Sequence, residues 1–219
     1  MVSYVFMKVL ESSARRYDAG INILSLGQVN KLKREIAVKY VAAGDKVLEI
    51  GCGTGTLAIL CAEKGASVFG FDISSEMLGI ASKKIQERNL GESVQLVEMG
   101  ATEMDKAFES ETFDKVVCTL VFSEFYSDEQ NYILREAYRV LKYGGLIVIA
   151  DEVMPNSLAK RILQLLVRTP LLVITYIVTQ TSTMAVRGIE NAIAGAGFEV
   201  VHQEMRLFDS LGLYVAGKV

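Results

Sequence analysis

The chain has 219 residues, of which 51% are apolar and 22% are charged, so it can bury one sizeable core and we expect a single domain. Lysine and arginine number 23 against 26 acidic residues, and no basic run is long enough to follow a phosphate backbone, which argues against nucleic acid as the main partner. Three widely spaced cysteines and one histidine form no metal-binding or redox motif, so we expect no metal and a reduced, cytoplasmic setting.

Neither the beginning of the chain nor its most apolar stretch resembles an export or membrane segment. The chain reaches Glu11 before a long apolar run has formed, which does not match a secretory leader. The most apolar stretch, residues 170–178, is nine residues long, whereas a membrane-spanning helix needs about 20. We therefore expect no export and no membrane span.

Five short runs rich in valine, isoleucine, leucine and phenylalanine are typical of buried strands. They are residues 46–50, 67–71, 94–98, 114–119 and 145–151. Between several of them, apolar residues recur at spacings of three and four, which predicts helices after Ser74 and after Asp128. Further helices are expected at 28–41 and 57–64. Strands that alternate with helices predict an α/β fold with a doubly wound, Rossmann-like parallel sheet.

The pattern changes after residue 151. Residues 157–168 and 184–196 have helical periodicity, and the apolar run lies between them. Runs 198–208 and 211–219, joined by Asp209 and Ser210, predict a C-terminal hairpin that brings the sheet to seven strands. We divide the single domain into N-terminal cap helices (1–45), a cofactor-binding core (46–151), an apolar and basic lid (152–184), and a helix with the hairpin (185–219).

The strongest local signal is a glycine-rich turn between the first strand and a helix. Gly51, Gly53 and Gly55 stand where only glycine lets a ligand touch the backbone. Thr56 occupies the third glycine position of the dinucleotide fingerprint, which disfavours a nicotinamide cofactor. Asp72, about 20 residues further on, can accept hydrogen bonds from both hydroxyls of a ribose. These residues predict a ribose-bearing ligand, for which NAD and S-adenosylmethionine are both candidates.

Three motifs, in this order, resemble those of class I S-adenosylmethionine-dependent methyltransferases. They are Glu49-x-Gly51-x-Gly53-x-Gly55, Phe71-Asp72-Ile73-Ser74, and the turn 139–145 ahead of the fifth strand. Arg16-Tyr17-Asp18 and residues 24–27 resemble the N-terminal segment of the ubiquinone and menaquinone C-methyltransferase branch, in which the tyrosine closes over the cofactor. Residues 122–125, 149–153, 170–176 and 179–181 also resemble the corrinoid-protein-associated methyltransferases of anaerobes.

The resemblance implies that S-adenosylmethionine is the cofactor and S-adenosylhomocysteine its product. The glycine loop, with Cys52 inside it, would border the methionine and ribose portions, while Glu49 orders the loop and Tyr17 closes over it. Asp72 and Ile73 would hold the ribose and adenine. The segment beside the adenine would be Gly100, Ala101 and Thr102. Family members usually have an aspartate where Ala101 stands, so adenine recognition is expected to rest on the backbone there.

Methyl transfer from a sulfonium needs mainly positioning, and it needs a general base only when the acceptor carries a proton that must leave. Glu124, Asp151 and Tyr17 are the predicted catalytic residues. Glu124 has a structural alternative as a solvated or helix-capping acid, and Asp151 as a hydrogen-bond partner of a loop. His202 falls in the late strand pattern, which we expect to lie away from the cofactor.

The segment 158–184 carries the question of the acceptor. It is basic through Lys160, Arg161 and Arg168, and it also contains the apolar run. It could be a lid over an apolar acceptor such as a quinone, a surface that contacts a membrane through 158–180, or a docking face for a corrinoid protein. It could also be a helix that only packs on the domain.

We therefore expect an enzyme that moves a methyl group from S-adenosylmethionine to an apolar small molecule or to a corrinoid-linked acceptor. It would act in the cytoplasm or at the inner face of the membrane. The alternative is a cofactor-binding module without turnover that docks a partner protein. A nicotinamide oxidoreductase is the third interpretation.

Overall fold

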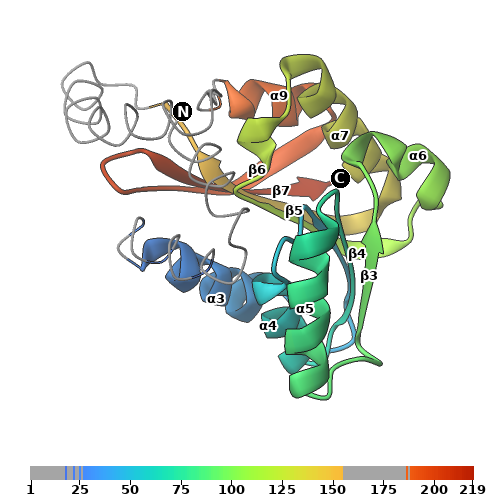
Figure 1. Ribbon diagram of the computed structural model, residues 1–219. Coiled ribbons are helices and arrows are strands. Elements are labelled where there is room, and N and C mark those ends of the chain that lie inside the picture. Colours follow the sequence, from blue (N-terminus) through green and yellow to red (C-terminus); the bar gives the residue numbers. More distant parts are fainter. Residues whose placement is uncertain (1–17, 19–21, 23–24, 26, 155–185, 187) are drawn as a thin grey trace.

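The computed structural model describes residues 18, 22, 25, 27–154, 186 and 188–219 (Figure 1). Seven strands form one sheet in the order β3-β2-β1-β4-β5-β7-β6. The strands are β1 (Lys46–Ile50), β2 (Ser67–Asp72), β3 (Val94–Glu98), β4 (Phe113–Thr119), β5 (Leu141–Glu152), β6 (Phe198–Arg206) and β7 (Leu211–Lys218). The first five are parallel, and β7 is antiparallel to both β5 and β6. The predicted Rossmann-like fold with a terminal hairpin is confirmed.

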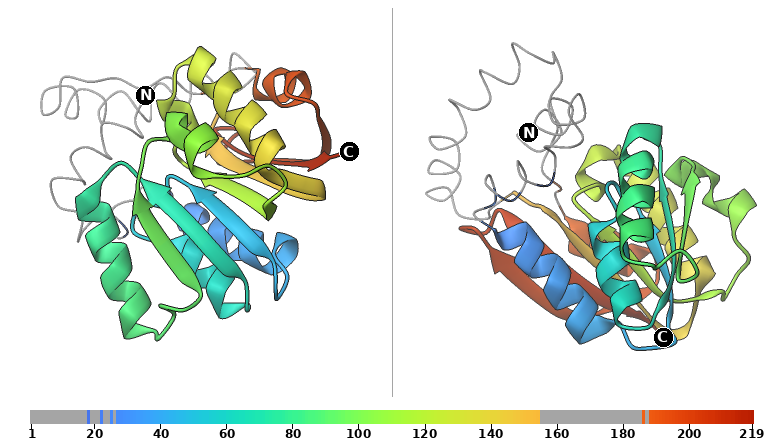
Figure 2. Two further views of the ribbon diagram at one scale, coloured as in Figure 1. Left: turned by 90° about the vertical axis from the view of Figure 1, so that its right-hand side faces the viewer. Right: turned by 60° about the horizontal axis from the view of Figure 1, so that its bottom comes forward.

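Helices cover both faces of this sheet (Figure 2). One face is covered by α3 (Gln28–Tyr40), α4 (Thr56–Glu63) and α5 (Ser75–Glu87), and the other by α6 (Met104–Ala107), α7 (Ser127–Val140) and α9 (Ile189–Gly195). Short 3-10 turns follow two strands, η1 (Ala101–Glu103) after β3 and η2 (Phe122–Glu124) after β4. Because β1, β2, β4 and β5 are parallel, their carboxyl ends lie at one edge of the sheet.

The central strands are apolar on both sides because they separate two buried cores. In β1, Val47 packs with α3 and α4, whereas its neighbour Leu48 packs with α6 and α7. The same alternation places Val117 and Val116 of β4 in the two cores. Burial on both faces explains why these strands appear in the sequence as nearly continuous apolar runs.

Two element boundaries differ from the sequence prediction by four residues or more. β5 begins at Leu141 instead of residue 145, because Leu141 pairs with Phe113 ahead of a register shift in the β4–β5 ladder. The helix predicted from residue 184 begins only at Ile189. Val186 is extended and bridges Val153, and the helix starts after Gly188, whose φ is +64°.

The C-terminal hairpin is confirmed, with a shorter first strand than predicted. β6 ends at Arg206 because Leu207, Phe208 and Asp209 turn the chain with φ values of +50°, +58° and +65°. His202 lies on β6, the outermost strand of the sheet.

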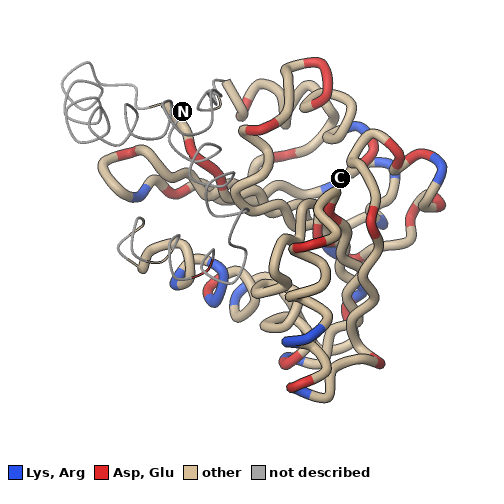
Figure 3. The backbone as a smooth tube through the Cα atoms, viewed as in Figure 1, with Lys and Arg blue, Asp and Glu red and all other residues tan. Residues whose placement is uncertain are grey.

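Much of the predicted lid, the helix expected at 157–168 and Tyr17 lie outside the described residues. Within the part that the structure describes, no helix is both long enough and apolar enough to cross a membrane. Basic and acidic residues are both spread over the described chain (Figure 3), in keeping with the nearly balanced composition.

We predict that Gly145→Ala destabilises the fold and that Gly79→Ala does not. A Cβ at Gly145 would lie 2.8 Å from the Lys142 carbonyl oxygen and 3.0 Å from that of Asp114, whereas a Cβ at Gly79, inside α5, meets no atom within 4 Å. Overpacking at Gly145 should cost about 1–3 kcal/mol, and the helical alanine should add about 0.5–1 kcal/mol. Urea denaturation measures both, and a loss of stability in Gly79→Ala equal to that in Gly145→Ala would contradict this assignment.

Candidate active site

The turn after β1 places bare backbone at the carboxyl edge of the sheet. Gly51, Gly53 and Gly55 have φ values of +64°, +52° and +71°, in the left-handed region that favours glycine. A Cβ at Gly51 would lie 2.7 Å from the Val121 side chain, whereas a Cβ at Gly53 would meet no atom within 4 Å. The loop is thus packed tightly at its start and leaves space at Gly53 for a ligand to approach the backbone.

Asp72, the last residue of β2, links this loop to the next strand. Its Oδ2 accepts a hydrogen bond from the Gly53 N–H at 2.8 Å, and its Oδ1 accepts one from the Ser74 N–H at 3.0 Å. Each carboxylate oxygen can accept a second hydrogen bond, so the two hydroxyls of a ribose can still be held. Ile73 follows directly and is 76% exposed, which offers an apolar surface beside them.

The end of β3 adds a third side to this region. The Met99 N–H donates to the Asp72 carbonyl oxygen at 3.0 Å. Gly100, the next residue, therefore lies close to the end of β2. Ala101 is buried at the start of η1, and Thr102 is exposed. Because alanine has no polar side chain, only backbone groups at Ala101 can form hydrogen bonds with a ligand.

Glu49 is a buried acid within β1, one residue before its end. It is 1% exposed, and neither carboxylate oxygen has a hydrogen-bond partner among the described residues. Burial raises the pKa of Glu49 to about 8, so the carboxyl group holds a proton at neutral pH. A buried acid without a partner at the base of the glycine loop is suited to receive a positively charged group of a ligand.

Asp151 occupies the end of β5 and is fully buried. Its Oδ2 accepts from the Ser123 N–H at 3.1 Å and its Oδ1 from the Glu152 N–H at 2.6 Å. It therefore has the loop-holding role that the sequence left open. Burial raises the pKa of Asp151 to about 6, so most molecules carry the carboxylate at neutral pH.

Glu124 lies in η2 beside Ser123, with one carboxylate oxygen buried. At the start of α7, Glu129 accepts from the Tyr126 N–H at 2.9 Å, and the alternative role of Glu124 as a helix cap stays a prediction. The turn that carries Glu124 is set by Leu120, whose φ of +60° is unusual for a branched side chain. This turn brings Glu124 and Asp151 to the same edge of the sheet.

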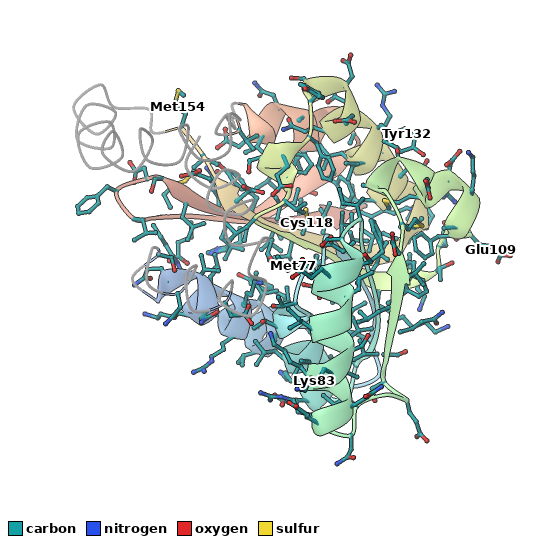
Figure 4. All side chains as sticks on the ribbon, viewed as in Figure 1. Met77, Lys83, Glu109, Cys118, Tyr132 and Met154 are labelled. Atoms are coloured by element: carbon teal, nitrogen blue, oxygen red, sulfur yellow. The ribbon has the colours of Figure 1, made fainter. Side chains whose placement is uncertain are left out.

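The cysteines of this region are not nucleophiles. Burial raises the pKa of Cys52 in the glycine loop and of Cys118 in β4 far above neutrality, so both remain thiols. Cys118 lies inside the molecule, surrounded by other side chains (Figure 4). Both residues fill space beside the site.

His202 is not part of this edge. It lies on β6, where its Nε2 is 3.9 Å from a Glu204 carboxylate oxygen and its ring centroid is 6.4 Å from that of Tyr40. No group of three potential metal ligands occurs within the described ranges. Tyr17 lies outside them, and its role stays a prediction.

Sequence reasoning missed a polar cluster that adjoins the glycine loop. The Asp18 carboxylate accepts a hydrogen bond from the Thr54 hydroxyl at 2.7 Å and forms an ion pair with Lys84. Two features could have indicated it. Asp18 belongs to the motif that contains Tyr17, and Lys84 lies three residues after the buried Ala81 in α5, on the same side of the helix.

Comparison with known proteins shows that the chain is similar to methyltransferases. A family described as "Methyltransferase domain" matches residues 47–145. The chain is 34% identical over 148 residues to a demethylmenaquinone methyltransferase of Lactobacillus johnsonii, covering 66% of this chain and 59% of the relative. It is 36% identical over 145 residues to a phosphatidylethanolamine N-methyltransferase of Cereibacter sphaeroides, covering 65% and 69%.

A solved structure, a SAM-dependent methyltransferase from Aquifex aeolicus, has the same fold. It superposes with a TM-score of 0.67 at 17% identity and covers 95% of this chain and 98% of that one. The chain spans 54% to 60% of the length of the first quinone methyltransferases that it matches.

We predict that Glu49→Gln changes how stability depends on pH. Between the unfolded pKa near 4.5 and the folded pKa of about 8, the folded chain holds a proton on Glu49 that the unfolded chain has released. Stability should therefore fall as pH rises through this window, by about 1.4 kcal/mol per pH unit from this group. The glutamine variant should lose that contribution and be more stable than the wild type at pH 7 to 8.

Denaturant titrations at several pH values between 5 and 8, without added ligand, measure this difference. Glu98→Gln is the control, because Glu98 is an exposed glutamate at the end of β3. If the Glu49 and Glu98 variants show the same pH slope as the wild type, Glu49 is not protonated in the folded state.

Proposed function

Because this chain belongs to the class I S-adenosylmethionine-dependent methyltransferases, we propose that it moves the methyl group of S-adenosylmethionine to an apolar small molecule. The observation that carries the proposal is the junction of the glycine loop with Asp72. This junction offers open backbone and a carboxylate that can hold a ribose. Both lie at the carboxyl ends of adjacent parallel strands, where ligands bind in open α/β sheets.

The residues at this edge fit the cofactor. Asp72 would hold the ribose hydroxyls, and the exposed Ile73 would lie against the adenine. The buried acid Glu49 has no partner among the described residues, and the amino group of the methionine portion would supply the positive charge that it lacks. Gly100 and the backbone of Ala101 and Thr102 would border the adenine.

When bound, the sulfonium of the cofactor supplies a methyl group that is already activated. The chain then needs to position the acceptor, exclude water and remove a proton where the acceptor has one to lose. Asp151 is suited to take that proton, because its pKa of about 6 leaves a carboxylate available at neutral pH. Glu124 is the neighbouring acid at the same edge, and Tyr17 is expected to close over the cofactor.

An apolar acceptor is the class that the relatives favour. The two relatives named above are a demethylmenaquinone methyltransferase and a phosphatidylethanolamine N-methyltransferase, and both names denote lipid-soluble acceptors. Besides Ile73, which is assigned to the adenine, the large side chain of Tyr126 before α7 is 81% exposed near this edge. Exposed apolar side chains of this size beside a site are typical of surfaces that bind apolar ligands.

Transfer of label from methyl-labelled S-adenosylmethionine tests the proposal. The protein is incubated with an extract of the cells that produce it, and the product is partitioned into organic, aqueous and protein fractions. We expect label in the organic phase. Label on protein or on an aqueous corrinoid would replace the apolar acceptor by the corrinoid-linked one. Binding of S-adenosylhomocysteine without any transfer would favour a module that docks a partner.

We predict that Asp151→Asn lowers the turnover number by about 100-fold or more and removes its acidic limb. A base with a pKa of about 6 must be deprotonated, so the wild-type rate should rise through pH 6 and level off above it. Rates are measured from pH 5 to 8 with the acceptor fraction that takes label. Asp128→Asn, at an exposed acid in the first turn of α7, is the control.

The affinity for S-adenosylhomocysteine shows whether the Asp151 variant keeps a formed cofactor site. A variant that binds this ligand normally and turns over at the wild-type rate and pH profile would show that Asp151 only holds the loop at Ser123.

A further inference from the structure

Asp18 is anchored against the outer side of the glycine loop. Its Oδ1 accepts hydrogen bonds from the hydroxyls of Thr54, at 2.7 Å, and of Thr56, at 3.4 Å. Its Oδ2 pairs with the ammonium group of Lys84 on α5. The Lys84 Nζ also donates to the Thr54 carbonyl oxygen at 3.1 Å. Two side chains from outside the loop therefore hold both the hydroxyl and the backbone of Thr54.

The environment of this cluster favours the ionised pair. The side chains of Lys84 and Asp18 are 28% and 38% exposed, so the pair is partly shielded from water. Burial alone would raise the pKa of Asp18, but the hydrogen bonds from Lys84 and Thr54 outweigh it and hold the pKa below its usual value. Partly buried, hydrogen-bonded pairs contribute more than surface pairs, which are worth about 0–1 kcal/mol.

The loop depends on α5 at a second point. A Cβ at Gly55 would lie 2.9 Å from the Cβ of Ala81, so this end of the loop already touches the helix. Ala81 and Lys84 are three residues apart and lie on the same side of α5. Thr54 is 3% exposed and stands between Gly53 and Gly55, both with positive φ.

We infer that Asp18 and Lys84 are positioning residues that hold the glycine loop in the conformation that binds the methyl donor. The inference rests on the proposed function, because it takes the loop to be the donor site. Fixing Thr54 from outside reduces the ordering that the ligand must otherwise impose on a loop with three left-handed glycines.

We predict that Asp18 and Lys84 increase the affinity of the glycine loop for its ligand. Asp18→Asn and Lys84→Met should each weaken the binding of S-adenosylhomocysteine by about tenfold, the scale of a charge-assisted hydrogen bond. The double variant should weaken binding by less than the product of the two single effects, because both single variants remove the shared Asp18–Lys84 ion pair. Lys83→Met is the matched control, since Lys83 is the preceding residue of α5 and its side chain is 78% exposed (Figure 4).

A second pair of variants separates positioning from folding. Thr54→Val removes the hydroxyl with little change of shape and should weaken binding, whereas Thr54→Ser keeps the hydroxyl and should restore most of the affinity. Isothermal titration with S-adenosylhomocysteine measures each dissociation constant at a temperature where the variant is folded. The thermal midpoint is recorded with and without the ligand, and the ligand-induced shift should shrink in the Asp18, Lys84 and Thr54→Val variants.

Two results would overturn the inference in distinguishable ways. If the wild type binds S-adenosylhomocysteine and the Asp18, Lys84 and Thr54→Val variants bind it equally well, the positioning role is wrong while the proposed function stands. If the wild type does not bind S-adenosylhomocysteine, the proposed function fails and the positioning role fails with it.

Discussion

The hydrogen bond from the Gly53 N–H to the Asp72 carboxylate joins two loops that the sheet only brings near each other. Through it, the turn after β1 is fixed relative to the start of α5, since the same carboxylate also binds the Ser74 N–H. Ser74 in turn caps α5 by accepting from the Met77 N–H at 3.3 Å. The position of α5, and with it that of Lys84, therefore follows from one carboxylate at the end of β2.

The acids at this edge differ in burial, in hydrogen bonding and in pKa. Asp72 is partly buried and accepts one backbone hydrogen bond on each carboxylate oxygen, whereas Glu49 and Asp151 are fully buried and their pKa values are raised. Burying a carboxyl without a compensating charge lowers the stability of the unliganded fold. A protein selected for stability alone would place an apolar residue at position 49. The acid there is consistent with a ligand that completes its environment.

The sequence was informative wherever burial decides the structure. Strand β1 has the predicted bounds because four of its five residues are buried, β3 has them as well, and Ser74 marks the start of α5 through its cap. The sequence failed where a distant partner decides: Leu141 extends β5 because Phe113 pairs with it, and Val186 is extended because it bridges Val153. Asp18 and Lys84 are 66 residues apart, and no local period links them.

The place of β7 in the sheet has a consequence for how the protein is made. All eight of its residues are buried, and it pairs with β5 on one side and β6 on the other. β7 follows every other strand of the sheet in the chain, so during synthesis β5 and β6 present open edges to each other until β7 has emerged from the ribosome. Exposed strand edges are where nascent chains associate wrongly. The interval between the emergence of β6 and that of β7 is therefore the one in which this chain most needs protection from its neighbours.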